Sequence, residues 1–399
     1  GRLLSDENPA YLADSWQIQS RQMVETGTDT DTSSSDTGTW TKYSTTKYGS
    51  DSCGNNVPNN TAWTNVGSPS APSYSNSNGV RTQTVTQQQS RTRFRCQYVS
   101  DGYYIQSAPQ TRDQYSYTYS EMRYRRVNYD VSAYKGFTSV STNTGSYGAA
   151  VSSTWNGCIE ERSTTAASSF SYSTINGITP AGARDLDIDS APTSDPVTQW
   201  GPMWPEVAYY RSTTAESSSG SQASSYCPYQ AQLLTSMTQA EFNSYADLLY
   251  PEGSTYLDIG MGWGGRLSSP TGIFANNVNI APSNGGGGSR HLIFMSDGDM
   301  QTSSSIQTSW GIEFLDHRIT TNGDNSSSDS RHTSRFLALC AAIKAKGIRV
   351  WTISFTTGTS SDLQTCASPN SYFDAADSTE LNDAFQEIAK QVGELRISQ

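Results

Sequence analysis

A short apolar segment at residues 292–295 limits the possible folds of this chain more than any other stretch. Four apolar residues follow one another without a polar residue, and the run ends at Ser296-Asp297-Gly298. A short run without alternation is typical of a strand that is covered on both faces, as in a parallel sheet. Residues 292–295 therefore predict a buried strand of such a sheet.

The residues that follow predict further elements of the same kind. A helical stripe precedes Gly347, which is a typical helix stop. The stripe consists of Phe336, Leu339, Cys340 and Ile343. Residues 348–355 predict a second strand, and the spacing of apolar residues in 381–395 predicts a long amphipathic helix. Strand, helix, strand and helix in this order predict an α/β fold with right-handed crossovers.

Residues 27–150 have a different composition, which is dominated by Ser, Thr, Tyr, Asn and Gly. Within residues 80–87, larger residues and threonine alternate from position 81 onward, and within residues 113–120 tyrosine stands at positions 115, 117 and 119. This alternation gives a strand one aromatic face and one face of small polar groups. Period-two segments bounded by Gly, Asn and Pro predict antiparallel β structure.

The charge balance excludes several classes of partner. Among 399 residues, 26 are Lys or Arg and 37 are Asp or Glu, giving a net charge of −11 at pH 7. We expect no nucleic-acid partner, because phosphate neutralisation supplies most of that affinity, and anionic membranes are disfavoured for the same reason. No stretch approaches 18 apolar residues, so no membrane segment is expected. The chain begins at Gly1 without a signal peptide, and we expect a processed piece of a longer product.

Six widely separated cysteines indicate the compartment. They are Cys53, Cys96, Cys158, Cys227, Cys340 and Cys366, and none forms a CxxC pair. The spacing argues against a zinc ribbon or a redox dithiol. An even count fits three disulfides in an oxidising compartment, with 15 connectivities open, and the alternative is six free thiols in a cytosolic protein.

Asp297 and Thr255 are the candidate metal ligands. Asp297 follows the apolar strand, so its carboxylate is expected at the carboxyl edge of the sheet, where open α/β sheets bind ligands. Upstream, Gly253-Ser254-Thr255 opens a helical stretch. A hydroxyl and a carboxylate are hard oxygen ligands suited to Mg²⁺ or Ca²⁺. The alternative is that Ser254 or Thr255 caps the helix and Asp297 caps a turn.

Residues 294–298, Phe-Met-Ser-Asp-Gly, resemble the strand and Asp-Gly element of von Willebrand factor A domains. Among proteins with such domains, the sequence resembles most the TadG-like proteins of bacterial tight-adherence (Tad) pilus systems. Further stretches that resemble this family are residues 155–162, 254–270, 339–348, 366–373 and 384–396. The resemblance covers residues 151–399 and also 1–16, whereas the Ser-, Thr- and Tyr-rich region looks like an insert.

This resemblance implies a fold and a domain division. The fold would be α/β, with a von Willebrand A-like open, mostly parallel sheet and flanking helices, plus a large Ser/Thr/Tyr-rich β insert. Residues 1–30 would form the N-terminal part of the von Willebrand A-like domain, 31–150 the β-rich insert and 151–399 the main domain.

The family's metal site combines an Asp-x-Ser-x-Ser loop, a Thr and an Asp, of which the Thr maps to Thr255 and the Asp to Asp297. The loop should follow an apolar first strand, and no copy here does so. The Asp-x-Ser-x-Ser motif does occur at residues 31–35 and 324–328, but both copies lie in Ser-rich stretches and are interpreted as chance matches. Residues 187–190 resemble the motif only superficially and are interpreted as a loop. We therefore expect Mg²⁺ or Ca²⁺ to bind weakly to this chain alone, at an incomplete adhesion-type site.

A disulfide pairing follows if each bridge joins cysteines of the same part of the chain, either the α/β part or the Ser/Thr/Tyr-rich insert. Cys340 lies on the buried helical stripe and Cys366 follows the next strand, which returns the chain past that helix. We predict Cys340–Cys366 and Cys158–Cys227 in the α/β part, and Cys53–Cys96 in the insert. Each bridge then lies within one of these two parts of the chain.

The sequence does not predict an enzyme. The three histidines show no zinc-ligand spacing, and no GxSxG or P-loop occurs. Glu160-Glu161 is interpreted as solvated or salt-bridged. An aromatic cluster could stack on sugars but is more typical of a packed loop; it consists of Trp200, Trp204, Tyr209 and Tyr210.

Three functions follow as hypotheses. The first is a secreted or bacterial cell-surface protein, reaching the surface through the periplasm, that acts without catalysis in adhesion or Tad pilus assembly through protein partners. The second is a subunit that self-assembles into extracellular filaments, since an open sheet edge is a template for another strand. The third is a carbohydrate-binding surface module.

Overall fold

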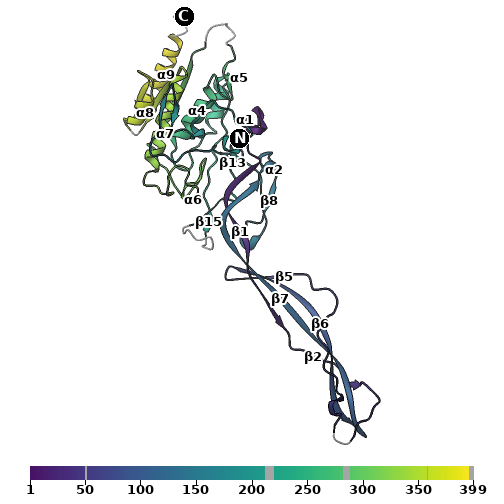
Figure 1. Cartoon of the computed structure of the whole chain (residues 1–399). Coiled ribbons are helices and arrows are strands. Elements are labelled where there is room, and N and C mark those ends of the chain that lie inside the picture. Colours follow the sequence, from purple (N-terminus) through teal and green to yellow (C-terminus); the bar gives the residue numbers. More distant parts are fainter. Residues whose placement is uncertain (50–51, 212–219, 282–287, 357, 395–399) are drawn as a thin grey trace. The chain divides into compact units, whose positions relative to one another are not determined.

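The computed structural model describes residues 1–49, 52–211, 220–281, 288–356 and 358–394 (Figure 1). The chain forms two compact units. Unit 1 contains residues 1–20, 124–142 and 151–399, and unit 2 contains residues 21–123 and 143–150. The boundaries differ from the predicted 31–150, because residues 124–142 return to unit 1, where Val131 and Tyr134 are buried in its core.

The predicted von Willebrand A-like open, mostly parallel sheet is wrong. Strand residues outnumber helical residues, and the main sheet has seven strands and is antiparallel. In the described part of the chain, the parallel sheet has three strands. The physical reason is that, among the described residues of unit 1, only 290–296 and 348–355 provide long strands with apolar runs, whereas the described strands between residues 151 and 222 have two or three residues each and pair antiparallel.

The seven-stranded sheet is built around one long hairpin. Strands β6 (Val80–Val99) and β7 (Gly102–Asp130) pair from Val80 with Glu121 to Val99 with Gly102, which is about 65 Å of ladder (Figure 1). The other strands of the sheet are β1 (Ser15–Thr32), β2 (Asp36–Thr37), β3 (Thr41–Lys42), β4 (Thr64–Asn65) and β5 (Ser73–Ser77). The antiparallel pairing predicted from the alternation is thereby confirmed.

The alternation also sorts side chains between the two faces of the hairpin. Tyr115, Tyr117 and Tyr119 stack along one face, with ring centroids 6.3 and 6.4 Å apart. On the other face, Arg91 and Arg112 lie over the Trp63 ring, at 4.6 and 4.3 Å from its centroid. Unit 2 therefore buries little and is held by its ladder, by these ring contacts and by one disulfide.

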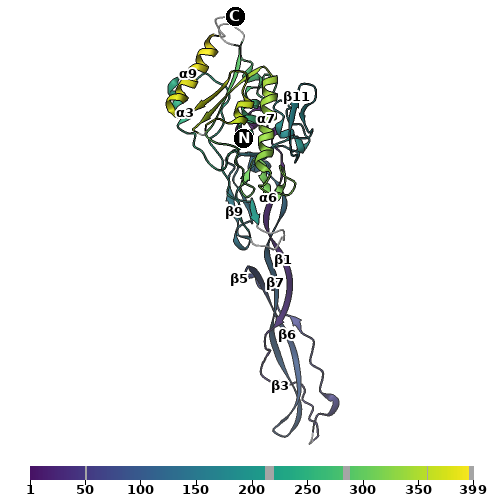
Figure 2. The ribbon, with the colours of Figure 1, turned by 90° about the vertical axis from the view of Figure 1, so that its left-hand side faces the viewer.

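Unit 1 contains the parallel sheet. Its strands are β16 (Arg290–Ser296), β19 (Ile348–Phe355) and β20 (Tyr372–Ala375), in the order β16-β19-β20. Helix α7 (Ser328–Ala345) lies on one side and α9 (Ser378–Glu394) on the other (Figure 2). The strands and helices predicted from the apolar runs and stripes are confirmed as elements. The cover on both faces predicted for residues 292–295 is wrong, because β16 ends the sheet and its Ile293 and Met295 are exposed.

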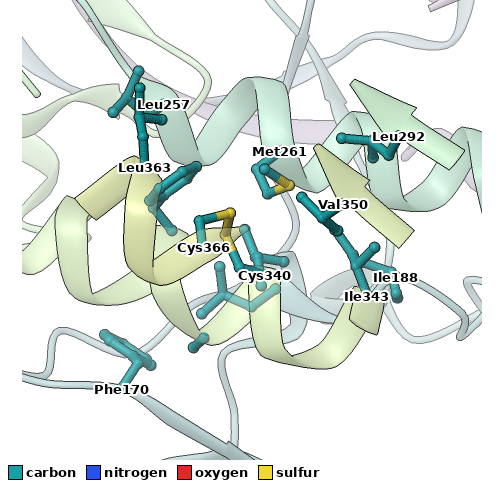
Figure 3. Close-up of a cluster of buried hydrophobic side chains, with 14 of the residues drawn as sticks. Phe170, Ile188, Leu257, Met261, Leu292, Cys340, Ile343, Val350, Leu363 and Cys366 are labelled. Atoms are coloured by element: carbon teal, nitrogen blue, oxygen red, sulfur yellow. A yellow bond between two sulfur atoms is a disulfide. The ribbon is translucent and has the colours of Figure 1, made fainter. Parts of the chain in front are cut away.

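Figure 3 shows the main core on the α7 face of this sheet. Met261 of α4 (Leu257–Ser268), Phe336 of α7 and Val350 of β19 are fully buried there. Gly347 ends the loop after α7 with a φ of 73°, in the left-handed region that favours glycine. Helix α8 (Ser361–Cys366) closes the cluster and carries Cys366.

The remainder of unit 1 consists of short elements around a second core, in which Leu4, Trp200 and Trp204 are buried. The helices are α1 (Arg2–Glu7), α2 (Ser132–Lys135), α3 (Gln239–Ala246), α5 (Ala275–Val278) and α6 (Glu313–Asp316). The strands are β8 (Val140–Thr142), β9 (Val151–Ser153), β10 (Ile159–Glu160), β11 (Ser171–Ser173), β12 (Gly177–Thr179), β13 (Gly201–Pro202), β14 (Tyr209–Arg211), β15 (Gly220–Gln222), β17 (Gln307–Thr308) and β18 (Gly311–Ile312).

The six cysteines form three disulfides, which are the three pairs expected from the sequence. They are Cys53–Cys96, Cys158–Cys227 and Cys340–Cys366, with Cα atoms 5.8, 5.8 and 5.2 Å apart. Each disulfide closes within one unit. Within the described part of the chain, no helix combines the length and apolar character needed to cross a bilayer.

Candidate functional site

The structure brings Thr255 and Asp297 to the same hollow at the carboxyl end of β16. The hollow has a volume of about 410 Å³, and Ser296, Phe294 and Phe355 also line it. Thr255 is fixed by two backbone hydrogen bonds with Gln301, in which each amide donates to the other carbonyl at 2.8 and 3.0 Å. The order of the elements along the chain thus predicts this juxtaposition correctly.

The oxygen donors in the hollow do not form a complete site for a divalent cation. Asp297 supplies an exposed carboxylate, and Thr255 and Ser296 supply hydroxyls, although Ser296 Oγ donates to the Gly298 carbonyl at 2.7 Å. The described residues contain no group of three His, Cys, Asp or Glu side chains placed to hold a metal. Because Mg²⁺ and Ca²⁺ take six or more oxygens, these side chains alone do not fit either ion.

The other Asp-Ser segments have local roles. The Asp187 carboxylate accepts hydrogen bonds from the Ser190 hydroxyl at 2.5 Å and from the Asp189 amide at 2.9 Å. The Asp324 carboxylate accepts from the Ser326 amide and hydroxyl. Asp31 belongs to unit 2, and its carboxylate accepts from the Thr32 amide. Asp187 and Asp324 thus build local turns, whereas Asp31 lies near the end of strand β1.

We expect titration of the isolated chain with Mg²⁺ or Ca²⁺ in a calorimeter to give dissociation constants of about 1 mM or weaker, because too few oxygens converge. Asp297→Ala should remove the residual heat, since it deletes the carboxylate of the hollow. Asp324→Ala, which alters an exposed turn, serves as the matched control and should change nothing. Tight stoichiometric binding to the wild-type chain would contradict the incomplete site.

A buried network of charges, which was not predicted, involves helix α4, whose first residue, Leu257, also lines the hollow. Arg266 of α4 donates to Glu161 at 2.6 Å, and both side chains are buried. The Trp200 indole N–H donates to the same carboxylate at 2.9 Å. Burial alone would raise the pKa of Glu161. The charge of the Arg266 guanidinium outweighs this effect and holds that pKa below its usual value. Of the two roles expected for Glu161, the salt bridge is confirmed and the solvated position is wrong.

A second part of the network joins α4 to α7. The Arg335 guanidinium is fully buried, pairs with the Asp185 carboxylate, and has its Nε 3.4 Å from Asp258 Oδ2. The His332 ring nitrogen Nδ1 lies 2.7 Å from the same Asp258 oxygen. The Trp310 indole N–H donates to Asp185 at 2.9 Å. The charges therefore hold α4 and α7 together with the loop at residues 184–187.

Sequence reasoning missed this network although two signals were present. His332 and Arg335 fall on the helical stripe that contains Phe336 and Leu339, and Arg266 lies within an apolar helix. Charged residues at positions that face a core indicate buried ion pairs. A single sequence does not pair them with Asp185 or Glu161.

Glu160 is a buried carboxyl group with a perturbed pKa. Its oxygens accept hydrogen bonds from the Trp16 indole N–H at 2.8 Å and from the Gln307 side-chain amide at 3.2 Å. Burial, reinforced by the charge of Asp316, raises the pKa of Glu160 from 4.5 to about 7. The folded protein therefore binds a proton there that the unfolded chain releases.

This raised pKa predicts a stability that falls with pH. The contribution of Glu160 is complete below pH 4.5 and is lost as the pH rises through 7, a loss of about 3 kcal/mol. Glu160→Gln should remove this dependence and be the more stable protein at pH 8, since its amide can donate to Gln307 Oε1, which has no partner among the described groups. Urea unfolding of wild type and Glu160→Gln at pH 5 and pH 8 measures the change in the free energy of unfolding.

Glu241→Gln is the control for that experiment, because Glu241 is exposed in the capping box of α3. It should leave the difference between pH 5 and pH 8 nearly unchanged. An equal pH dependence in Glu160→Gln and wild type would show that Glu160 is ionised in the folded protein.

The aromatic cluster considered for sugar binding is part of the core. Trp200 and Trp204 are buried, and the Trp204 ring stacks on Tyr134 with centroids 4.2 Å apart. The Trp204 indole N–H donates to Ser153 Oγ at 2.6 Å. Tyr209 is buried as well. Tyr210 is partly buried and its ring packs edge-on against Phe314, with centroids 5.4 Å apart. Trp200, Trp204 and Tyr209 present no face to a sugar, so the carbohydrate-binding hypothesis loses most of the residues on which it rested.

An apolar surface lies on residues 226–250 instead. Large side chains that are more than a third exposed follow one another there: Tyr226, Tyr229, Leu234, Phe242, Leu248, Leu249 and Tyr250. Helix α3 lies within this segment and buries none of its residues, although a complete capping box with Thr238 stabilises its start. We call these seven side chains the apolar surface.

A cavity of about 920 Å³ adjoins the apolar surface. Leu3 and Leu4 of α1, Leu233 and Trp263 line it, together with Tyr226 and Tyr229 of the apolar surface. Residues 226–256 contain three acidic residues and neither Lys nor Arg. Exposed apolar side chains that gather on one segment beside a cavity indicate an interaction site in a folded protein.

Neither a protein-family model, nor a curated protein, nor a solved structure matches this chain.

Proposed function

We propose that the protein is an extracellular, non-catalytic binding protein that holds a protein partner at the apolar surface. The single observation that carries this proposal is the run of exposed apolar side chains between Tyr226 and Tyr250 beside the cavity. These side chains are about half exposed, so burying the rest of each against a partner would contribute about 1 kcal/mol. The partner that fits this surface is apolar and carries basic residues, since Glu241, Asp247 and Glu252 lie in the segment.

The three disulfides support an oxidising compartment outside the cytosol. The stretches that resemble TadG-like proteins support a more specific role, in adhesion or pilus assembly of a bacterial Tad-like system. In this role the protein would be secreted or held at the cell surface, and its partners would be pilus or surface components.

Shearing of producing bacteria tests the proposal. Surface filaments are pelleted from the sheared material, and the protein is measured in the pellet and in the medium. Phe242→Ser with Leu249→Ser should reduce the pelleted share roughly tenfold or more, since two apolar contacts are lost. The matched control is Ile175→Ser, which changes an isoleucine that is 91% exposed elsewhere in unit 1. Wild-type protein that is absent from the pellet, or an unaffected double variant, would overturn the proposal.

Self-assembly into filaments is the second candidate. The two end strands of the parallel sheet, β16 and β20, favour it, since no described strand pairs with their outer edges and pairing of unlike edges can continue from chain to chain. Electron microscopy of the purified protein at high concentration tests it. Filaments that form without another protein would support self-assembly, whereas uniform separate particles would contradict it.

A further inference from the structure

Strand β16 ends the parallel sheet on one side. It pairs with β19 from Arg290 to Ser296, and no described strand pairs with its other edge. An edge strand presents unpaired backbone N–H and C=O groups, which another strand can bind. A seven-residue edge of this kind needs either a cover or a partner.

The side chains of β16 show that helix α9 does not cover it. Ile293 and Met295 stand beside Trp351 and Ile353 in the register of the sheet, on the face where α9 packs. Trp351 and Ile353 are fully buried there, whereas Ile293 is 43% and Met295 49% exposed. The apolar face therefore continues beyond the helix that covers its neighbours. Parallel sheets are normally covered on both faces.

The two ends of β16 carry opposite charges. Arg290 and His291 begin the strand, and Asp297 and Asp299 follow its end. A strand that pairs with a copy of itself in the antiparallel direction places the beginning of each strand against the end of the other. The charges of this edge are thus complementary to the same edge of another molecule.

We propose that a second copy of this chain binds along the edge of β16, with the two strands antiparallel around a two-fold axis at Phe294. Ile293 then stands opposite Met295 of the second copy, and Met295 opposite its Ile293, so the exposed apolar side chains cover one another. The two three-stranded sheets become one sheet of six strands, an isologous contact of the commonest type.

The same register places His291 opposite Asp297 of the second copy. The Trp351 indole N–H donates to His291 Nδ1 at 3.0 Å, so Nδ1 is an acceptor and Nε2 carries the hydrogen. Within the chain, Nε2 lies 3.0 Å from the exposed Ser289 hydroxyl. In the dimer, it can donate to the Asp297 carboxylate of the second copy. An isologous contact closes at two chains, so this dimer is a different assembly from a filament, and it does not depend on the proposed partner of the apolar surface.

Sedimentation equilibrium of the full chain tests the proposal between about 1 and 200 μM. Wild type should be dimeric at the upper end, and Ile293→Lys should weaken the dimer more than about a hundredfold, because it buries an unpaired charge and removes an apolar contact. Ile175→Lys, at an isoleucine outside the sheet that is 91% exposed, should leave the dimer intact. Near-UV circular dichroism checks that both variants are folded.

Cross-linking tests the register. A variant with Ile293→Cys and Met295→Cys should form disulfide-linked dimers on mild oxidation, since opposite residues of antiparallel strands have Cα atoms within disulfide range. Ile293→Cys alone should cross-link poorly, because its counterpart is diagonal in this register. A wild-type chain that is monomeric throughout, or a dimer that survives Ile293→Lys, would overturn the proposal. So would a monomer whose β16 edge is taken up by a strand of another protein.

Discussion

Arg335→Ala should destabilise unit 1 by about 3–5 kcal/mol. The guanidinium is fully buried, and its removal leaves Asp185 and Asp258 as buried carboxylates without their shared cation. Burial lowers the pKa of Arg335 to about 9, so the group is still charged at pH 7. Urea unfolding followed by tryptophan fluorescence measures the loss, since Trp310 donates to Asp185 and reports on this region directly.

Arg126→Ala is the matched control for this prediction. Arg126 pairs with Asp316 at 3.5 Å, and its side chain is about half exposed, so its loss should cost less than about 1 kcal/mol. Arg335→Met tests the origin of the effect, because it keeps the volume and removes only the charge. If both Arg335 variants unfolded at the wild-type urea concentration, the carboxylates would have to be neutral in the folded protein.

Replacing Cys340 and Cys366 together by alanine should cost about 3–4 kcal/mol. The bridge closes a loop of 26 residues, and in the chain-entropy model such a closure restricts the unfolded chain by roughly this amount. Both sulfurs are also buried among Met261, Phe336 and Val350, so their loss leaves a small cavity in the core. Hydrogen exchange of peptides from α7 and β19 measures the change within unit 1.

Replacing Cys53 and Cys96 by serine provides the comparison, since this bridge lies in unit 2. It should leave the exchange of α7 and β19 at the wild-type rate. A map of unreduced peptides is the second check. A link from Cys53 or Cys96 to a cysteine after residue 150 would contradict the pairing on which both variants are based.

The apolar core elements could be predicted from the sequence, because burial leaves a direct trace in the order of residues. The run at 292–295, the stripe before Gly347 and the strand at 348–355 appear in the structure as β16, α7 and β19. The fold class could not be predicted in the same way. Pairs such as β10 with β13 have only two residues per strand, too few to show a period, and they join residues about forty positions apart.

The candidate site likewise has features that could be predicted from the sequence and features that could not. Thr255 and Asp297 could be placed together because each precedes or follows an element whose direction in the sheet is predictable. The charge network could not, because Glu161, Asp185, Arg266 and Arg335 are distant in sequence and resemble surface residues when taken singly. The exposure of Phe242 could not be predicted either, since apolar residues in a capped helix usually face a core.

The three bridges join the first cysteine to the second, the third to the fourth, and the fifth to the sixth. A chain that is exported from its N-terminus presents its thiols in this same order. An oxidising enzyme that joins each new thiol to the one waiting before it would therefore produce the native set directly. On this pathway no wrong bridge has to be broken, so maturation of the protein should need an oxidase and should proceed at the wild-type yield without a disulfide isomerase.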